Sequence, residues 1–147
     1  EDFLKKVSEK FDIECTLSVK PYKPSEPHTF GMYLDKSWYK LTAKKGSYSK
    51  RSVVKSLDVS ILQDNLISPI LGINDPKTDK RIDFVGGIRG LKELEKRANS
   101  DMCLAFSMYP TTIDELISIA DAKKLMPPKS TWFEPKLLSG LFIHKLS

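Results

Sequence analysis

Cysteine, histidine and long apolar runs are scarce in this chain of 147 residues, which has two cysteines and two histidines. Neither Cys15 nor Cys103 belongs to a paired motif, so the sequence suggests neither a disulfide framework nor a zinc ribbon. His28 and His144 lie far apart and without metal-ligand spacing, so we expect no structural metal. No apolar run approaches the roughly 20 residues that a membrane helix needs, and we expect no membrane association.

The thiols and the first residues suggest where the protein works. Cys15 has the apolar phase of a predicted strand and Cys103 lies in an apolar run, so both are expected to be buried and inert. The first residues lack the parts of a secretory signal, and a reducing, cytoplasmic setting is the expected location. There is no initiator methionine. We therefore expect the chain to be a fragment of a longer protein.

The net charge is mild, at +5 with a sequence pI near 9.1, and it permits anionic partners without requiring them. Four basic residues surround Tyr48 in the stretch from Lys44 to Arg51. Basic residues interleaved with an aromatic ring can bind nucleic acid, although a solvated loop has the same composition. Four cations give few phosphate contacts, so nucleic acid is not the partner that we expect, and such binding should vanish near physiological salt.

The order of apolar patterns predicts one α+β domain over residues 1–147, with helices packed on a mixed, partly antiparallel sheet. A hairpin turns near Asp35-Lys36, Pro69 should end or bend a helix, and Thr112 opens a helix in capping-box spacing with Glu115. The continuous apolar run 102–108 predicts an interior strand. The expected helices are 3–11, 56–71, 90–99 and 112–122, and the expected strands are 12–19, 28–34, 37–43, 82–87, 102–108 and 141–146.

The first candidate site is the glycine turn, residues 86–90, between a predicted strand and a predicted helix. Gly86, Gly87 and Gly90 let a backbone come close to a ligand, and the free N–H groups of a helix start favour an anion. Arg89 would add a bidentate grip on phosphate or carboxylate. The glycine spacing differs from the dinucleotide-binding fingerprint. A plain tight turn, with positive φ at Gly86 or Gly87, is the other interpretation.

The second candidate is the proline segment, residues 125–140, which reads LMPPKSTWFEPKLLSG. Its prolines fix φ and so lower the entropy cost of holding a site. The phosphate-binding side chains that it offers are Lys129, Ser130, Thr131 and Lys136. A proline-stiffened loop, held to the core by Trp132 and Phe133, is the alternative.

Three stretches, ILGINDPKTDKRIDFVGGIRG, AFSMYPTTIDELISIAD and MPPKSTWFEPKLLSGLFIHKL, resemble the C-terminal part of the bacterial and archaeal family catalogued as domain of unknown function 1015. The resemblance covers the chain from about Leu57 onward, and the first half loosely. It implies an N-terminal region that this chain lacks, and it carries no established activity. The family's marked positions fall on Gly86, Gly87, Thr111, Thr112, Met126, Pro127, Pro128, Lys129, Ser130, Thr131, Phe133, Pro135, Lys136, Gly140 and Leu141.

Together these patterns predict that the domain binds a small anionic metabolite, bearing phosphate or carboxylate, at a site formed by the Gly86–Gly90 turn and the Pro127–Lys136 segment. Two alternatives stay open. One is a non-catalytic interaction domain that packs on the missing N-terminal region of the same protein. The other is weak nucleic-acid binding through the Lys44–Arg51 loop. The sequence assigns no catalytic residue and no cofactor, and it leaves open whether the protein is an enzyme.

Overall fold

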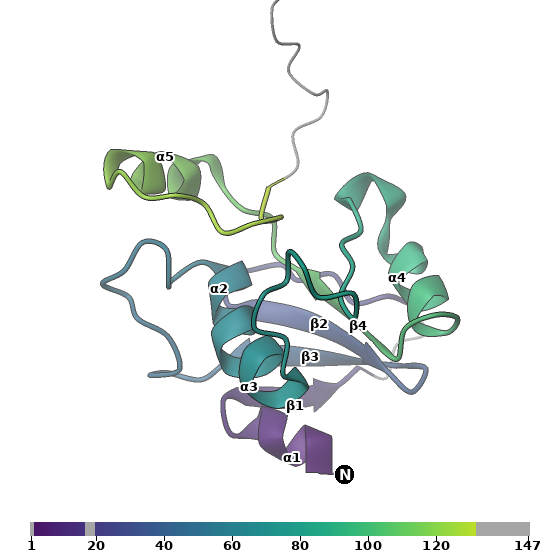
Figure 1. Ribbon diagram of the computed structural model, residues 1–147. Coiled ribbons are helices and arrows are strands. Elements are labelled where there is room, and N and C mark those ends of the chain that lie inside the picture. The colour runs from purple at the N-terminus through teal and green to yellow at the C-terminus, as the bar shows by residue number, and fades with distance from the viewer. Residues whose placement is uncertain (1, 17–19, 132–147) are drawn as a thin grey trace, which may run out of the picture.

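The computed structural model describes residues 2–16 and 20–131, and a four-stranded antiparallel sheet lies at their centre (Figure 1). The strands are β1 (Phe11–Cys15), β2 (Thr29–Leu34), β3 (Ser37–Ala43) and β4 (Leu104–Met108), in the order β1-β3-β2-β4. The α+β class is confirmed. The sheet differs from the predicted mixed one, because each pair of described strands is antiparallel.

The hairpin of β2 and β3 forms as predicted. Asp35 and Lys36 have φ angles of 48° and 61°, so both turn residues are left-handed. Two left-handed residues make the turn whose twist matches that of the flanking strands. The register then pairs Leu34 with Ser37 and continues to Thr29 opposite Thr42.

Strand β4 is an edge strand of the described sheet, so the prediction of an interior strand is wrong. It pairs only with β2 among the described strands, and Leu104 and Phe106 are half-buried. The irregular chain before β2 covers one face of β4, where the Ser107 hydroxyl donates to the Tyr22 carbonyl at 2.8 Å. An apolar run therefore predicts burial by neighbouring segments without showing that a further strand lies beside it.

One face of the sheet carries the core. Phe11 of β1 meets Phe30 of β2 edge to face, with ring centroids 5.7 Å apart. Helix α1 (Asp2–Ser8) contributes Val7, and the helices in front of the sheet in Figure 1 contribute Ile61 and Leu66. Rings and apolar chains that all lose contact with water provide the main stabilisation of such a domain.

The helix predicted over 56–71 changes its helical type just before Pro69. It consists of α2 (Asp58–Leu62), the π-helical segment η1 (Gln63–Ile67) and α3 (Ser68–Leu71). Proline has no N–H to donate to the Asn65 carbonyl four residues earlier, so the regular α-helical pattern cannot continue through it. The widened turn of η1 accommodates this loss.

The opposite face of the sheet is covered by α4 (Leu91–Ala98). Trp38 of β3 donates its indole N–H to Glu95 at 2.7 Å, and Asn99 donates to the Tyr33 hydroxyl at 3.0 Å. The prediction of a strand over 82–87 is wrong. Residues 82–86 are irregular and lead into the short 3₁₀ turn η2 (Gly87–Arg89). The strand predicted over 141–146 lies outside the described residues.

Helix α5 (Ile113–Asp121) begins with the predicted capping box of Thr112 and Glu115. Its apolar residues do not all lie on a buried side, because Ile113 and Ile117 are 75% and 51% exposed while Ile119 is buried. The helix stands off the sheet above α2 in Figure 1, so only one side of it meets the rest of the described chain.

Both cysteines are exposed, so the prediction of buried thiols is also wrong. Cys15 is the last residue of β1, an edge strand of the described sheet. At such an edge, a side chain at an apolar position of the alternating pattern can still be exposed to solvent. Cys103 lies just before β4 begins.

Candidate functional site

The glycine turn leads into α4 through Gly90, not through the first two glycines. Gly90 has φ of 73°, whereas Gly86 has an ordinary extended conformation with φ of −63°. No side chain caps the first turn of α4, because its N-cap residue is this glycine. Arg89 is exposed beside it. The turn thus presents backbone donors and one guanidinium to solvent.

The described part of the proline segment, residues 125–131, contains no helix or strand. The Ser130 hydroxyl donates to the Pro127 carbonyl at 2.6 Å, and Thr111 donates to the Ser130 carbonyl at 3.0 Å. Lys129 is exposed and left-handed, with φ of 57°, and Thr131 is exposed. Lys136 lies outside the described residues. Within 2–16 and 20–131, no hydrogen bond or ion pair joins this segment to the glycine turn, and their convergence stays a prediction.

The Lys44–Arg51 loop, which the sequence offers only as an alternative site, forms part of a hollow. Residues 44–57 fold against α2 and η1 and leave a cavity of about 310 Å³, which we call the loop pocket. Hydroxyl, ammonium, carboxylate and amide groups share its wall with one apolar side chain. The lining residues are Gly46, Ser47, Tyr48, Ser49, Lys55, Ile61, Asp64 and Asn65.

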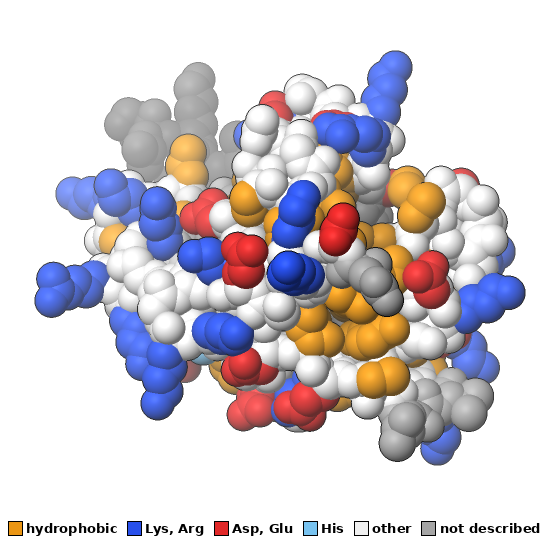
Figure 2. All heavy atoms as spheres, turned by 90° about the horizontal axis from the view of Figure 1, so that it is seen from below, with side chains coloured by type: hydrophobic (Ala, Val, Ile, Leu, Met, Phe, Trp, Pro, Cys, Tyr) orange, Lys and Arg blue, Asp and Glu red, His pale blue; other side chains and the backbone are white. Residues whose placement is uncertain are grey.

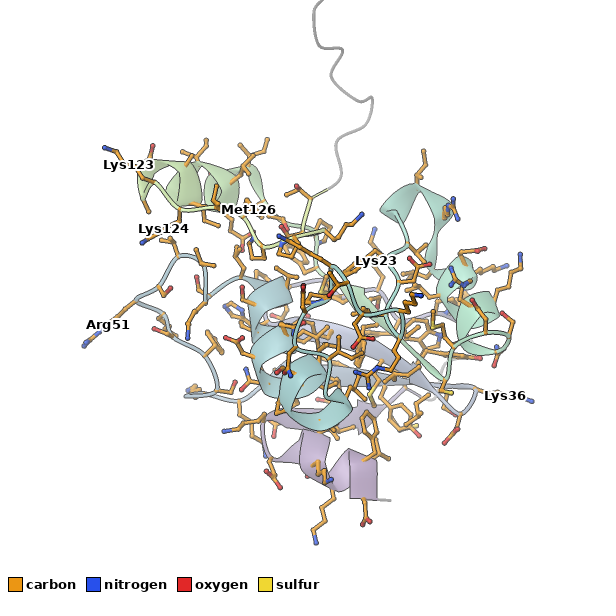
Figure 3. All side chains as sticks on the ribbon, viewed as in Figure 1. Lys23, Lys36, Arg51, Lys123, Lys124 and Met126 are labelled. Carbon is orange, nitrogen blue, oxygen red and sulfur yellow. The ribbon has the colours of Figure 1, made fainter. Side chains whose placement is uncertain are left out.

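The chain beside the loop pocket is strongly basic. Residues 44–55 contain five cationic side chains and no acidic one. Lys44 donates to the Ser8 carbonyl at 2.6 Å and lies 3.7 Å from a carboxylate oxygen of Asp12. The side chains of Lys45, Lys50, Arg51 and Lys55 form neither a hydrogen bond nor an ion pair with other described residues. Basic side chains gather over the side of the molecule where this loop lies (Figure 2), and Arg51 extends outward from it (Figure 3).

The wall opposite this loop comes from the π-helical segment. Asp64 and Asn65 both belong to η1, so the irregular turn before Pro69 places two polar side chains in one wall. Asn65 is fixed because its amide donates to the Ile61 carbonyl at 2.9 Å. Single π turns inside helices occur frequently at functional sites.

Close to the loop pocket, the fold brings together His28 and Asp58. Both the backbone N–H and the Nδ1 of His28 lie within hydrogen-bond distance of Asp58 Oδ1, at 2.8 and 3.0 Å. His28 is left-handed, with φ of 64°, a conformation uncommon for a residue other than glycine. Thirty positions separate the two residues, so no local spacing in the sequence could have indicated this pair.

Asp58 is an unusual carboxylate. Burial raises its pKa, against the opposing effect of His28, and the nearby Glu115 carboxylate raises it further. Its Oδ2 is buried and has no hydrogen-bond partner among the described residues. Buried polar groups are normally paired, and one that is not is a common feature of functional sites.

Tyr48 links this pair to the loop pocket. Its ring lies against the His28 imidazole with centroids 4.4 Å apart, and the same residue lines the pocket. The imidazole, the buried carboxylate and the basic loop therefore form one neighbourhood. Four of the lining residues lie in the Lys44–Arg51 loop, which the sequence offers only as an alternative nucleic-acid site, and none is among the residues of the predicted anion site.

The described chain shows no group of three or more metal-ligating side chains and no helix long and apolar enough to cross a membrane. Residues 1–60 match the family described as "Protein of unknown function (DUF1015)". The match supports membership of the chain in that family, in agreement with the resemblance. It spans His28, the basic loop and Asp58, whereas the resemblance is strongest after Leu57. That the chain is the C-terminal part of such a protein stays a prediction. No curated protein and no solved structure matches.

Proposed function

We propose that the protein binds a small anionic metabolite, bearing phosphate or carboxylate, and that the loop pocket holds it. The observation that carries this proposal is a cavity of about 310 Å³ that is lined by Lys55, a cation without a partner among the described residues, in a loop that carries three more such cations. Uncompensated positive charge around a concave surface concentrates anions there. The volume suits a small molecule, since ligand pockets begin at roughly 300 Å³.

The lining groups indicate which part of a ligand each could bind. Lys55 would contact the anionic group. Ser47 already donates its hydroxyl to the Lys44 carbonyl at 2.8 Å, so Tyr48 and Ser49 are the hydroxyl donors of the lining that remain for the ligand. Asp64 would accept a hydrogen bond and would repel a second anionic group. The pocket therefore favours an anion that also carries a hydroxyl group.

A small ligand fits this surface better than nucleic acid does. Single-stranded nucleic acid is bound by stacking its bases on exposed aromatic rings. Tyr48 is the aromatic residue of the loop, and His28 already covers one of its faces. The basic charge remains available, whereas the stacking surface is partly used.

Two other proposals keep an observation in their favour. The uncapped start of α4 and the exposed Arg89 support an anion site at the glycine turn, where the sequence predicts one. The exposed Ile113 and Ile117 of α5 support an interaction domain, because apolar side chains in a row commonly mark a protein contact. The experiment below separates both from the loop pocket.

Glycerol 3-phosphate is a suitable ligand to test, since it has a phosphate and two hydroxyl groups. Calorimetric titration should show binding to the full chain. The double change Lys50→Gln with Lys55→Gln should weaken it about tenfold or more, the loss expected for removing a charged hydrogen bond.

A matched control carries the same loss of charge elsewhere. Lys5→Gln with Lys36→Gln changes two exposed lysines of α1 and the hairpin turn, and Figure 3 places Lys36 at the opposite end of the molecule from Arg51. The control should bind like the unchanged protein. Equal losses in the two variants would mean that only net charge matters, and an unchanged affinity in the first would remove the loop pocket from the proposal.

A further inference from the structure

The His28–Asp58 pair has the arrangement of an oriented hydrogen-bond acceptor. We propose that His28 Nε2 accepts a hydrogen bond from a hydroxyl group of the anionic ligand, and that Asp58 is the positioning residue that orients the imidazole. The inference rests on the proposed function, since the loop pocket has to hold the ligand. It adds a specificity-determining residue, one that selects anions with a hydroxyl group, to a site that would otherwise select only for charge.

Asp58 fixes which nitrogen of His28 is free. Its Oδ1 lies 3.0 Å from Nδ1, so in the neutral imidazole Nδ1 carries the proton and donates it to the carboxylate. The lone pair is then on Nε2. An imidazole held in one tautomer by a carboxylate is the common element of histidine bases in otherwise unrelated enzymes.

Nε2 is accessible. In the described part of the chain it forms no hydrogen bond, and the single buried side-chain nitrogen or oxygen atom without a partner is Asp58 Oδ2. The His28 side chain is 33% exposed, whereas that of Asp58 is 11% exposed. A buried carboxylate behind a partly exposed imidazole leaves one nitrogen facing outward.

The backbone holds the imidazole in place. The His28 N–H donates to Asp58, and its carbonyl accepts from the Ala43 N–H at 2.9 Å, so three hydrogen bonds fix a residue of unfavourable φ. Left-handed residues other than glycine persist only where the surroundings enforce them, and they cluster at functional sites. The fixed geometry reduces the entropy cost of forming a hydrogen bond between the imidazole and a ligand hydroxyl group.

No covalent bond breaks when the hydroxyl group binds. The ligand hydroxyl keeps its proton and donates it as a hydrogen bond to Nε2, while the Nδ1–H of the same ring donates to Asp58. Hydrogen bonds in such a chain polarise one another, so Asp58 strengthens the acceptor at Nε2. Tyr48 of the loop and Glu115 of α5 are the other ionisable side chains that the structure places next to the pair.

The test compares two phosphate monoesters of equal charge, glycerol 3-phosphate and methyl phosphate, which lacks a hydroxyl group. Nitrogen-15 NMR of the imidazoles follows His28, and the chain has one other histidine to assign. Free protein should show a protonated Nδ1. Glycerol 3-phosphate should shift the Nε2 signal and methyl phosphate should not, while both shift the backbone amides of residues 46–49.

His28→Asn is the matched variant. Asparagine tolerates the left-handed conformation, and its amide can donate to Asp58, so the fold should persist without Nε2. The variant should still bind both esters. Its preference for glycerol 3-phosphate should fall about two- to tenfold, the range of one hydrogen bond. In the unchanged protein this preference should decline with the fraction of neutral His28 in the same spectra.

The outcomes separate the two proposals. Amide shifts at residues 46–49 without an Nε2 response, or an undiminished preference in His28→Asn, would overturn the acceptor role of His28 and leave the binding function intact. No amide shift with either ester would overturn both. Asp58→Ala should let the Nε2–H tautomer appear, and a spectrum unchanged in this variant would contradict the positioning role of Asp58.

Discussion

Replacing Gly31 of β2 by alanine should strongly destabilise the protein. Gly31 lies opposite Ser107 of β4 and Lys40 of β3. An added methyl group would collide with the Ser107 hydroxyl and would lie 2.9 Å from the Tyr22 carbonyl oxygen and 3.0 Å from a ring carbon of Trp38. Two of these neighbours are backbone or a buried ring, so neither can move aside easily.

The cost has two parts. Overpacking a filled interior costs about 1–3 kcal/mol. The methyl group would also displace the Ser107 hydroxyl from the Tyr22 carbonyl, and that hydrogen bond contributes about 0.5–1.5 kcal/mol. The free energy of unfolding should therefore fall by roughly 2–4 kcal/mol, a large share of the roughly 5–15 kcal/mol typical of domains. For a chain of this size the melting temperature would fall by about 5–15 °C.

Urea unfolding followed by circular dichroism measures this loss, with Gly87→Ala as the control. A methyl group at Gly87 meets nothing within 4 Å, so this variant should lie within about 1 kcal/mol of the unchanged protein. If Gly31→Ala were as stable as Gly87→Ala, the close packing of β2 against Ser107, Tyr22 and Trp38 would be wrong.

Two further predictions concern charge and turn conformation. Hydrogen bonds from Arg97 lower the pKa of Asp83 and Asp101, so they stabilise the fold above the unfolded pKa of about 3.8 and this stabilisation is lost as the pH falls below it. Urea unfolding at pH about 5 and about 2.5 should therefore show a smaller decrease in Arg97→Gln than in the unchanged protein, and equal decreases would contradict these pairs. Lys36→Gly should stabilise the hairpin by about 0.5–1 kcal/mol, since it relieves a left-handed lysine at a small entropic cost, and a loss of stability in the same assay would refute that turn geometry.

The features that the sequence predicts well are local ones. The hairpin turn at Asp35-Lys36 and the capping box of Thr112 and Glu115 each depend on residues a few positions apart, and both form as expected. The π-helical segment before Pro69 also has a local cause, because the missing N–H belongs to that one residue. Signals of this kind need no knowledge of the rest of the fold.

The features that the sequence misses depend on distant neighbours. Nothing near residue 102 shows that β4 lies at the edge of the described sheet, since its apolar side chains are covered by other segments. His28 and Asp58 meet only because β2 and α2 pack together. The loop pocket likewise needs the basic loop to fold back on η1, which composition alone cannot indicate.

The central claim, that an anionic ligand occupies the loop pocket, is tested most directly by mapping backbone amide shifts of the full chain during titration with glycerol 3-phosphate. We expect saturable shifts at residues 46–49, 55 and 64–65, with little change at 86–90 and 129–131. Shifts confined to 86–90 and 129–131 would contradict the claim and would favour the site that the sequence predicts.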